Sequence, residues 1–355
     1  MRTAKEQHGR CCVDLVSDTA TRPGGAMREA MAAADVGDEQ RHEDPTVTAL
    51  CERVATLLGK EQAIFLPSGT MCNQIALLVH CRPGDEILAA ESSHVLTSEG
   101  AGAAALAGAF VRALPAYRGV FRATDLHAAI RPSGPKSPRT RLVVVEQTHN
   151  QGGGSVWPID AIREVAASTR AAGLMLHMDG ARLLNAEVAS GVSARNHALP
   201  FDSVWLDLSK GLGCPVGALL AGDRPFIDAA WVWKHRLGGA MRQAGILAAA
   251  GLYALDHNVD RLAEDHDNAL AFAERAAAIP GVRVDPYPVE TNMVFLDVSG
   301  TGRSADDIAA RLQASGIRIG VEGATRLRAV THLDVTRADC LRAAEQLAAA
   351  VAGTS

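Results

Sequence analysis

The sequence predicts an α/β protein in which a large, mainly parallel sheet is followed by a small α+β domain. Apolar runs of strand length alternate with helical stretches along the first two thirds of the chain, as in parallel sheets covered on both faces. From about residue 282 the pattern changes to short strands and helices of a compact α+β unit. We therefore expect a large domain over 1–255, with an N-terminal arm at 1–13, and a small C-terminal domain over 256–355.

Individual elements follow from hydrophobic spacing and from start and stop signals. Asp44 can cap a helix, Pro45 suits its first turn, and Gly59 can end it. Strands of the large domain are expected at 62–66, 86–90, 110–114, 142–147, 174–178, 203–208 and 216–221. Helices are expected at 25–35, 45–58, 71–80, 98–109, 125–130 and 158–172 and across 225–279. The small domain should contain strands at 292–298, 317–320 and 327–331 and helices at 304–315 and 336–351.

Composition narrows the classes of function. The 355 residues carry a formal net charge of −5 and 48% hydrophobic residues, with no basic patch for a nucleic acid or an anionic membrane. The longest apolar stretch, 244–255, is shorter than the roughly 20 residues that span a bilayer. Seven cysteines without a CxxC pattern indicate a reduced, cytoplasmic chain. The histidines lack a zinc-ligand spacing, so no metal is expected.

Charged side chains follow two apolar runs at the points where the predicted strands end. Asp179 and Arg182 follow the run at 174–178, and Lys210 follows the run at 203–208. Ligands of α/β proteins bind at the carboxyl ends of strands, so these three residues are expected to face one crevice. A carboxylate, a guanidinium and an amine suit an aldehyde cofactor that needs a Schiff-base lysine and a partner for a pyridinium nitrogen.

A second ligand-binding feature is the turn Ser68-Gly69-Thr70, which joins the strand at 62–66 to the next helix. Amides and hydroxyls at a helix N-terminus can bind a phosphate group. A tight turn with a hydroxyl cap is the structural alternative.

With these residues in view, the chain resembles the threonine aldolases of the β-eliminating lyase group, which are fold-type I enzymes dependent on pyridoxal phosphate (PLP). The resemblance runs in order from about residue 14 to 335 and rests on DLVSDTATRP, EDPTV, FLPSGTMCNQIALL, SSHVLTSEGAG, HMDGARLLNA, LSKGLG, GGAMRQAGILAAAGLYAL and RAVTHLDV. It implies retro-aldol cleavage of a β-hydroxy-α-amino acid such as L-threonine or L-allo-threonine to glycine and an aldehyde.

The resemblance implies a role for each matching residue. Lys210 would be the Schiff-base lysine, and Asp179 would hold the pyridinium nitrogen charged. His94 would stack on the cofactor ring and is the candidate base, while Ser68, Gly69 and Thr70 would hold the phosphate. Ser17, Arg182 and Arg328 would bind the substrate carboxylate, and Arg242 would reach a neighbouring subunit's cofactor phosphate. The partners implied are therefore an amino-acid substrate and further copies of the chain in a homodimer or homotetramer.

Two positions depart from the family pattern and border the expected site of the substrate's β-side. Arg41 stands where the family usually has a tyrosine, two residues before Glu43-Asp44-Pro45. Lys136, in a proline-rich loop, stands where a histidine is often proposed to touch the substrate. Both departures keep open β-elimination, transamination or racemisation on the same scaffold. A nicotinamide-dependent oxidoreductase is disfavoured, because the glycines at 100–102 do not follow a buried strand.

Overall fold

The computed structural model describes residues 13–132 and 134–353, which divide into two compact units. The larger unit is Pro23–Val259, and the smaller combines Asp260 onward with the residues up to Arg22. The predicted boundary at 255/256 lies close to this division. Residues 13–22 group with the smaller unit because β1 (Val13–Leu15) pairs in parallel with β11 (Ile317–Gly323). The predicted arm at 1–13 lies, except for its last residue, outside the described residues.

The larger unit contains a seven-stranded sheet in the order β2-β8-β7-β6-β5-β3-β4. Its strands are β2 (Gln62–Leu66), β3 (Asp85–Ala90), β4 (Phe110–Leu114), β5 (Arg139–Glu146), β6 (Met175–Gly180), β7 (Ser203–Asp207) and β8 (Ala218–Gly222). Strands β3 to β7 pair in parallel, whereas β8 runs antiparallel to both of its neighbours. The mainly parallel sheet expected from the sequence is therefore confirmed.

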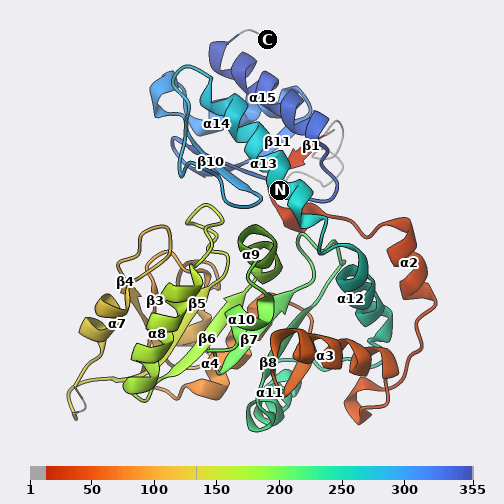
Figure 1. Ribbon diagram of the computed structural model, residues 1–355, viewed down its shortest axis with the longest axis vertical. Helices are drawn as coiled ribbons and strands as arrows, with labels where there is room; N and C mark the ends of the chain where they lie inside the picture. The colour runs from red at the N-terminus through yellow and green to blue at the C-terminus, as the bar shows by residue number, and fades with distance from the viewer. Residues whose placement is uncertain (1–12, 133, 354–355) are drawn as a thin grey trace. The chain divides into compact units, whose positions relative to one another are not determined.

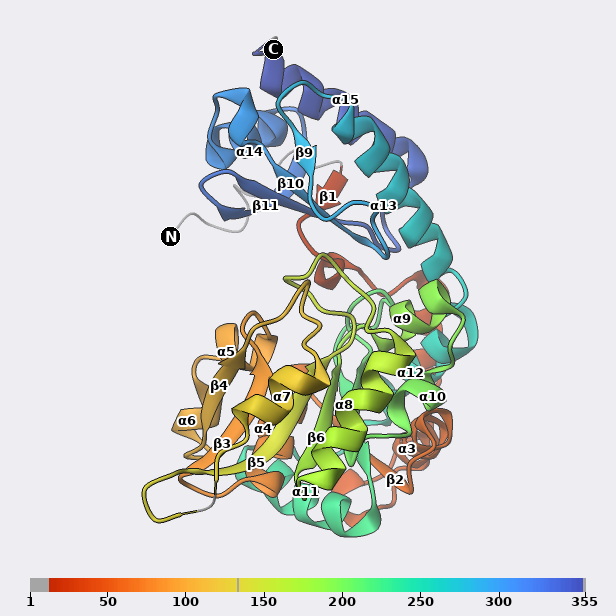
Figure 2. The ribbon, with the colours of Figure 1, turned by 60° about the vertical axis from the view of Figure 1, so that its left-hand side comes forward.

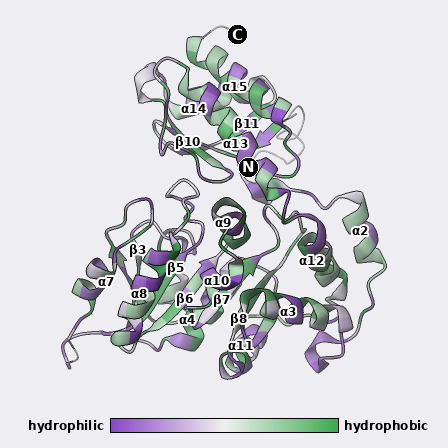
Figure 3. Cartoon of the chain, in the orientation of Figure 1, coloured by the Kyte–Doolittle hydropathy of each residue, from purple (hydrophilic) through white to green (hydrophobic). Residues whose placement is uncertain are grey.

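Helices cover both faces of this sheet, with α3, α8 and α10 on one face and α4 and α11 on the other (Figures 1 and 2). The helices of this unit are α2 (Gly25–Ala32), α3 (Pro45–Leu58), α4 (Gly69–His80), α5 (His94–Thr97), α6 (Gly102–Ala105), α7 (Ala123–Ala129), α8 (Ile159–Ala171), α9 (Leu183–Ser190), α10 (Ala194–Ala198), α11 (Arg224–Arg236) and α12 (Gly245–His257), with the 3-10 turn η2 (Glu39–Arg41). Every residue of β3, β7 and β8 is buried, as in strands covered on two faces. The hydrophobic colour of the central strands in Figure 3 follows from this double cover.

Local signals place several helix ends as predicted. The Asp44 side chain accepts a hydrogen bond from the Val47 amide, Pro45 is in the first turn of α3, and Gly59 ends it with a φ of 63°. The helix predicted at 98–109 was wrong, since this stretch contains only the short α6 after α5. Gly100 and Ala101 interrupt it just before α6, with φ values of 60° and 58°.

The smaller unit is a five-stranded sheet in the order β1-β11-β12-β10-β9, and only the β1–β11 pair is parallel. Its further elements are β9 (Arg283–Val284), β10 (Met293–Asp297), β12 (Arg326–Val330), α13 (Leu262–Ala277), α14 (Ala305–Ala314), α15 (Arg337–Ala352) and the 3-10 turns η1 (Asp18–Ala20) and η3 (Ser299–Thr301). Its own apolar core includes Leu15, Phe272, Val294 and Leu347. Among the described residues, none of the helices combines the length and apolar character that crossing a membrane requires.

Candidate active site

Asp179 and Lys210 lie at the carboxyl ends of adjacent parallel strands. Asp179 is near the end of β6, opposite Trp205 of β7, and Lys210 follows β7 by three residues. The Lys210 amine lies 3.1 Å from Oδ2 of Asp207, and its charge acts to lower the pKa of Asp179. The structure therefore brings together the two charges that the strand ends predicted.

The Asp179 carboxylate is buried in a site that disfavours its negative charge. Its Oδ2 accepts a hydrogen bond from Asn73 Nδ2 at 2.8 Å, and its Oδ1 accepts one from the Ala181 amide at 3.1 Å. Burial, followed by the negative charge of Glu146, raises the pKa of Asp179 to about 7. A cationic group bound beside this carboxylate would stabilise its ionised form.

Among the described lysines of the larger unit, Lys210 is the one that lies at the carboxyl end of a strand beside Asp179. The chain has five lysines, and Lys5 lies outside the described residues. Lys60 donates to the Phe201 carbonyl, Lys136 is in an exposed loop, and Lys234 is buried against Glu39. Lys210, with 19% of its side chain exposed, is the lysine placed to meet a carbonyl compound at the strand ends.

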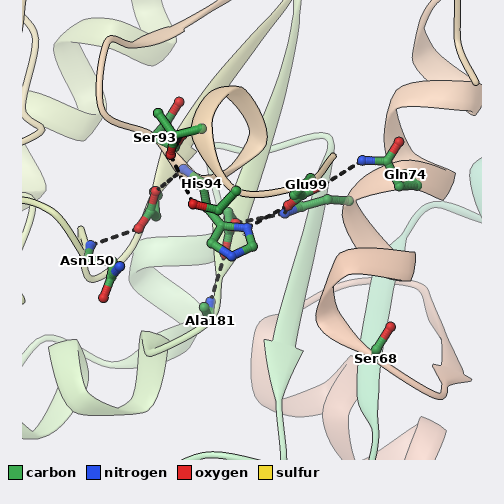
Figure 4. A network of polar contacts seen from close by, with 12 residues as sticks. Ser68, Gln74, Ser93, His94, Glu99, Asn150 and Ala181 are labelled. Atoms are coloured by element: carbon green, nitrogen blue, oxygen red, sulfur yellow. Dashed lines mark hydrogen bonds and ion pairs between the residues drawn. The ribbon is translucent and has the colours of Figure 1, made fainter. Parts of the chain in front are cut away.

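His94 begins α5 and is held by two acidic residues. Its Nδ1 lies 2.8 Å from Oε1 of Glu99, and its amide donates to Oε2 of Glu146 at 2.8 Å (Figure 4). The hydrogen bond to Glu99 raises the pKa of His94, against the opposing effect of burial. Because Glu99 accepts from Nδ1, the neutral imidazole presents Nε2 as a proton acceptor.

The start of α4 has the form of an anion site. Ser68 caps the helix by accepting a hydrogen bond from the Met71 amide at 3.2 Å, and both Ser68 and Thr70 are exposed. A Cβ at Gly69 would lie 2.1 Å from the indole of Trp205, so only glycine allows this close approach of the helix to β7. The first amides of a helix point outward with a favourable dipole for a phosphate.

These groups fit PLP. Lys210 supplies an amine for its aldehyde, and Asp179 supplies a buried carboxylate whose raised pKa shows that it lacks sufficient positive charge. The turn at 68–70 supplies amides and hydroxyls for its phosphate. Asn73 connects two of these parts, since it lies on the helix that starts at Gly69 and contacts Asp179.

The residues predicted for the substrate carboxylate fall into both units. Arg182 follows Asp179 in the larger unit, caps the start of α9 and is buried. Ser17 and Arg328 belong to the smaller unit, where Arg328 Nη2 donates to the Val16 carbonyl at 3.3 Å. Ser17 Oγ accepts from the Thr19 amide, and Arg328 Nη1 lies 3.1 Å from Glu322 Oε1. Within the smaller unit, Ser17 therefore caps a turn and Arg328 forms an ion pair.

Arg242 and Arg41 share one acidic neighbour in the larger unit. Arg242 Nη1 lies 2.9 Å and Arg41 Nε lies 3.9 Å from Oδ2 of Asp38. Both guanidinium side chains are largely exposed, with 61% and 73% of their surface accessible. Arg41 therefore lies at the surface, next to the Asp38 carboxylate that also pairs with Arg242.

Within its own chain, Lys136 lies before the end of β5 that is far from Asp179. Lys136 lies in an exposed turn that leads into Arg139, the first residue of β5. Asp179 pairs with Glu146 at the opposite end of that strand. Eight residues of extended chain separate these ends by roughly 25 Å. Aligning this loop by sequence alone could not show that it enters the sheet from the far edge.

The segment that carries Arg242 is anchored by a buried ion pair. The Lys234 ammonium contacts Oε1 of Glu39, and Oε2 of Glu39 accepts from the Met241 amide at 2.9 Å. Lys234 also lies over the Trp231 ring, 4.5 Å from its centroid. These contacts tie η2 to the loop between α11 and α12.

Replacing Lys234 by methionine is expected to lower the free energy of unfolding by roughly 3–5 kcal/mol, because Glu39 would remain buried without its cation. Urea unfolding of the purified protein measures this loss. The matched control is Arg53→Ala, which removes the exposed Arg53–Asp256 pair at 3.2 Å and should cost less than about 1 kcal/mol. Equal losses for the two variants would contradict a structural role for the buried pair.

Sequence reasoning missed most of the polar side chains that support the site. Asn73 and Gln74 donate to Glu99, each at 2.6 Å, and Glu146 accepts from the Asn150 amide at 2.7 Å. Two consecutive amides inside an otherwise apolar helix were the available signal for Asn73 and Gln74. One ligand atom each of His94, Glu99 and Asp179 lie within 4.8 Å of one another. The Asn73 amide, which donates to both carboxylates, and the hydrogen bond between His94 and Glu99 account for this grouping.

Comparison with known proteins identifies the family of the chain. The family model for beta-eliminating lyases matches residues 14–299. The chain is 44% identical over 326 residues to a low specificity L-threonine aldolase of Escherichia coli strain K12, covering 92% of this chain and 95% of the relative. It is 40% identical over 332 residues to low-specificity L-threonine aldolase 1 of Arabidopsis thaliana, covering 92% and 93%. A crystal structure of a putative L-allo-threonine aldolase from Listeria monocytogenes EGD-E superposes with a TM-score of 0.80 at 22% identity, covering 99% and 98% of the chains.

The fold and the site define a PLP-dependent enzyme of fold type I, with its lysine after one parallel strand and its aspartate on the next. Within that class, the chain belongs to the beta-eliminating lyase family.

Proposed function

We propose that this enzyme cleaves a β-hydroxy-α-amino acid of the L-threonine or L-allo-threonine type to glycine and an aldehyde. The observation that carries the proposal is the position of Lys210 and Asp179 on neighbouring strands, with His94 and its acidic partners beside them. The two relatives named as low-specificity L-threonine aldolases, each at 40% identity or above, support the same reaction.

Each residue has a task that follows from its chemistry. Lys210 would hold PLP covalently, Asp179 would hold its ring nitrogen protonated, and the turn at 68–70 would bind its phosphate. When bound, PLP supplies an electron sink for the pair left on Cα. Arg182, assisted by Ser17 and Arg328, would grip the substrate carboxylate and thereby decide which bond at Cα is broken.

His94 is the proposed base. Its Nε2 would take the proton of the β-hydroxyl as the Cα–Cβ bond breaks, so that Cβ leaves as an aldehyde and Cα later gains a proton to give glycine. The hydrogen bond from Nδ1 to Glu99 keeps Nε2 unprotonated in the neutral ring. His94→Asn should therefore retain PLP and lose most turnover, and near wild-type turnover would show that another group is the base.

The hydrogen bond between Glu99 and His94 predicts a pH dependence. Glu99 raises the pKa of His94, and a base must be deprotonated, so kcat/KM should rise with pH through that raised pKa. In Glu99→Gln the pKa of His94 falls, and the rise in kcat/KM should move to lower pH. The matched control is Glu187→Gln. The Glu187 carboxylate on α9 accepts a hydrogen bond from the amide of Ala194, the first residue of α10. Superimposable pH profiles for wild type and Glu99→Gln would contradict this coupling.

We further propose a homodimer or homotetramer in the cytoplasm. The exposed Arg242 is held by Asp38 at the surface, where it is available to a second copy, and its role at a neighbour's phosphate is supported by the family resemblance. The described cysteines, Cys51, Cys72, Cys81, Cys214 and Cys340, are free, which suits a reducing compartment. Sedimentation of wild type and Arg242→Ala, with and without PLP, tests the shared site.

Product analysis of the holoenzyme tests the reaction itself. Incubation with L-threonine, L-allo-threonine and their D-isomers should yield glycine and acetaldehyde from at least one L-isomer. The reverse reaction, from glycine and an aldehyde with chiral analysis of the product, reports the preferred configuration at Cβ. An oxo acid or ammonia as the main product would contradict the proposal and indicate β-elimination or transamination. Interconversion of the enantiomers would indicate racemisation instead.

A further inference from the structure

A buried amide joins the two carboxylates of the site. Asn73 is on α4 and is fully buried. Its Nδ2 donates to Glu99 Oε1 at 2.6 Å and to Asp179 Oδ2 at 2.8 Å. Both hydrogens of one amide group are thus used, one on the partner of His94 and one on the carboxylate assigned to the cofactor.

Trp205 determines which way this amide faces. The indole Nε1 of Trp205 donates to Oδ1 of Asn73 at 2.7 Å. An indole N–H can only donate, so the amide oxygen must face Trp205 and the NH2 group must face the carboxylates. The ring of Trp205 also packs directly against Gly69, so one side chain positions both Asn73 and the start of α4.

A chain of neutral histidines continues from the same oxygen. His177 Nε2 lies 3.1 Å from Asn73 Oδ1, His177 Nδ1 lies 2.8 Å from Ser203 Oγ, and Ser203 Oγ lies 2.7 Å from His80 Nε2. Burial lowers the pKa of both His80 and His177 to about 3, so both rings are neutral near pH 7. The single consistent direction of donation then runs from His80 through Ser203 and His177 to Asn73.

We propose that Asn73 is a positioning residue that keeps Asp179 ionised and holds both Asp179 and Glu99 in the correct orientation, and that Trp205 and His177 hold its amide in the direction this requires. The inference rests on the proposed role of Asp179 toward PLP. It adds a residue that touches neither substrate nor cofactor and acts through the two carboxylates.

The charges around Asp179 make this donor important. Glu146 on β5 and Glu99 after α5 oppose the ionisation of Asp179, as does its own burial, whereas Lys210 favours it. His94 and Cys72 are the other titratable groups that interact with Asp179. Lys210, the Ala181 amide and Asn73 favour the carboxylate, and removing the Asn73 donor takes away one of these interactions, so Asp179 should ionise only at higher pH.

The test measures the affinity of the apoenzyme for PLP between pH 6 and pH 9. In Asn73→Leu, the ratio of the variant's Kd to the wild-type Kd should be largest at pH 6, about fivefold at pH 7, where wild-type Asp179 is half ionised, and should shrink toward one at pH 9. Trp205→Phe removes the indole N–H together with the part of the ring that packs against Gly69, so the pH-dependent part of its Kd shift, which should be smaller than in Asn73→Leu, reports on the orientation of Asn73. Asn268→Leu, at a buried asparagine of the smaller unit that donates to the Val335 carbonyl, is the matched control and should bind PLP normally.

A pH-independent ratio, or wild-type affinity in Asn73→Leu, would overturn the inference, because a purely structural defect does not follow the ionisation of Asp179. If Asn73→Leu does not fold, as judged by circular dichroism, Trp205→Phe decides alone. Asp179→Asn separates this inference from the proposed function. If Asp179→Asn keeps the wild-type pH dependence of PLP binding, the proposed role of Asp179 is wrong. If Asp179→Asn loses this pH dependence and Asn73→Leu keeps it, the role of Asp179 stands and the inference about Asn73 fails.

Discussion

Lys210→Ala is expected to abolish turnover, with kcat lower by at least about a thousandfold, which is roughly 4 kcal/mol of activation free energy. The reason is chemical: among the lysines of the described chain, Lys210 is the one placed beside Asp179 at the strand ends, and no other amine can form the covalent bond to PLP there. Mass spectrometry after borohydride treatment measures that bond directly, since reduction fixes the cofactor to the lysine that holds it.

The control for this experiment is a lysine with an unusual amine. Burial lowers the pKa of Lys60 to about 8, so its amine is also reactive near neutral pH, but it donates to the Phe201 carbonyl. Lys60→Ala should keep PLP attached after reduction and keep its turnover. Labelling of a peptide containing Lys60, or retention of the label in Lys210→Ala, would contradict the assignment.

The strand pattern accounts for how much of the site could be predicted. Asp179 and Lys210 follow apolar runs, and in a mainly parallel sheet the ends of adjacent strands meet, so their proximity required only the correct strand assignments. The same reasoning predicted the helix start at 68–70. Pairing of Val13–Leu15 with β11 could not be predicted, because a three-residue strand has little local signal and its partner is some 300 residues away.

Side-chain contacts across elements were beyond the sequence for a different reason. Glu99 and Gln74 meet because a tight turn before α6 lies against α4, where a Cβ at Gly102 would be 2.4 Å from Gln74 Oε1. Helix α9 was missed because its apolar residues show almost no amphipathic spacing, and α10 because it has only five residues. The position of the Lys136 loop relative to the sheet could not be predicted either, because a resemblance in sequence does not state at which edge of the sheet a loop lies.

Asp179→Asn is expected to lower kcat/KM by roughly 10²–10³-fold, the usual loss when one well-placed electrostatic group is removed from an active site. Asparagine has nearly the same shape, so the variant tests the charge rather than the packing. Without a carboxylate beside it, the ring nitrogen of PLP would no longer be held protonated, and the cofactor would be a weaker electron sink.

The same variant also makes a prediction for binding. The pKa of Asp179 is raised to about 7 in the free protein, so as pH falls through 7 the carboxylate takes up a proton and the site loses the charge that attracts the cofactor. Wild-type affinity for PLP should therefore weaken below pH 7, and this step should be absent in Asp179→Asn. Fluorescence titration of the apoenzyme at several pH values measures it.

Asp265 provides the matched control for a buried acid with a raised pKa. Burial raises the pKa of Asp265 to about 6, and Arg261 Nη2 lies 2.6 Å from its Oδ1, within the smaller unit. Asp265→Asn should retain the step in PLP affinity near pH 7, since the charge that it removes belongs to a different ion pair. If Asp265→Asn removed the step and Asp179→Asn kept it, Asp179 would not be the acid that holds the cofactor. The position of Asp179 and Lys210 at neighbouring strand ends would then need another explanation.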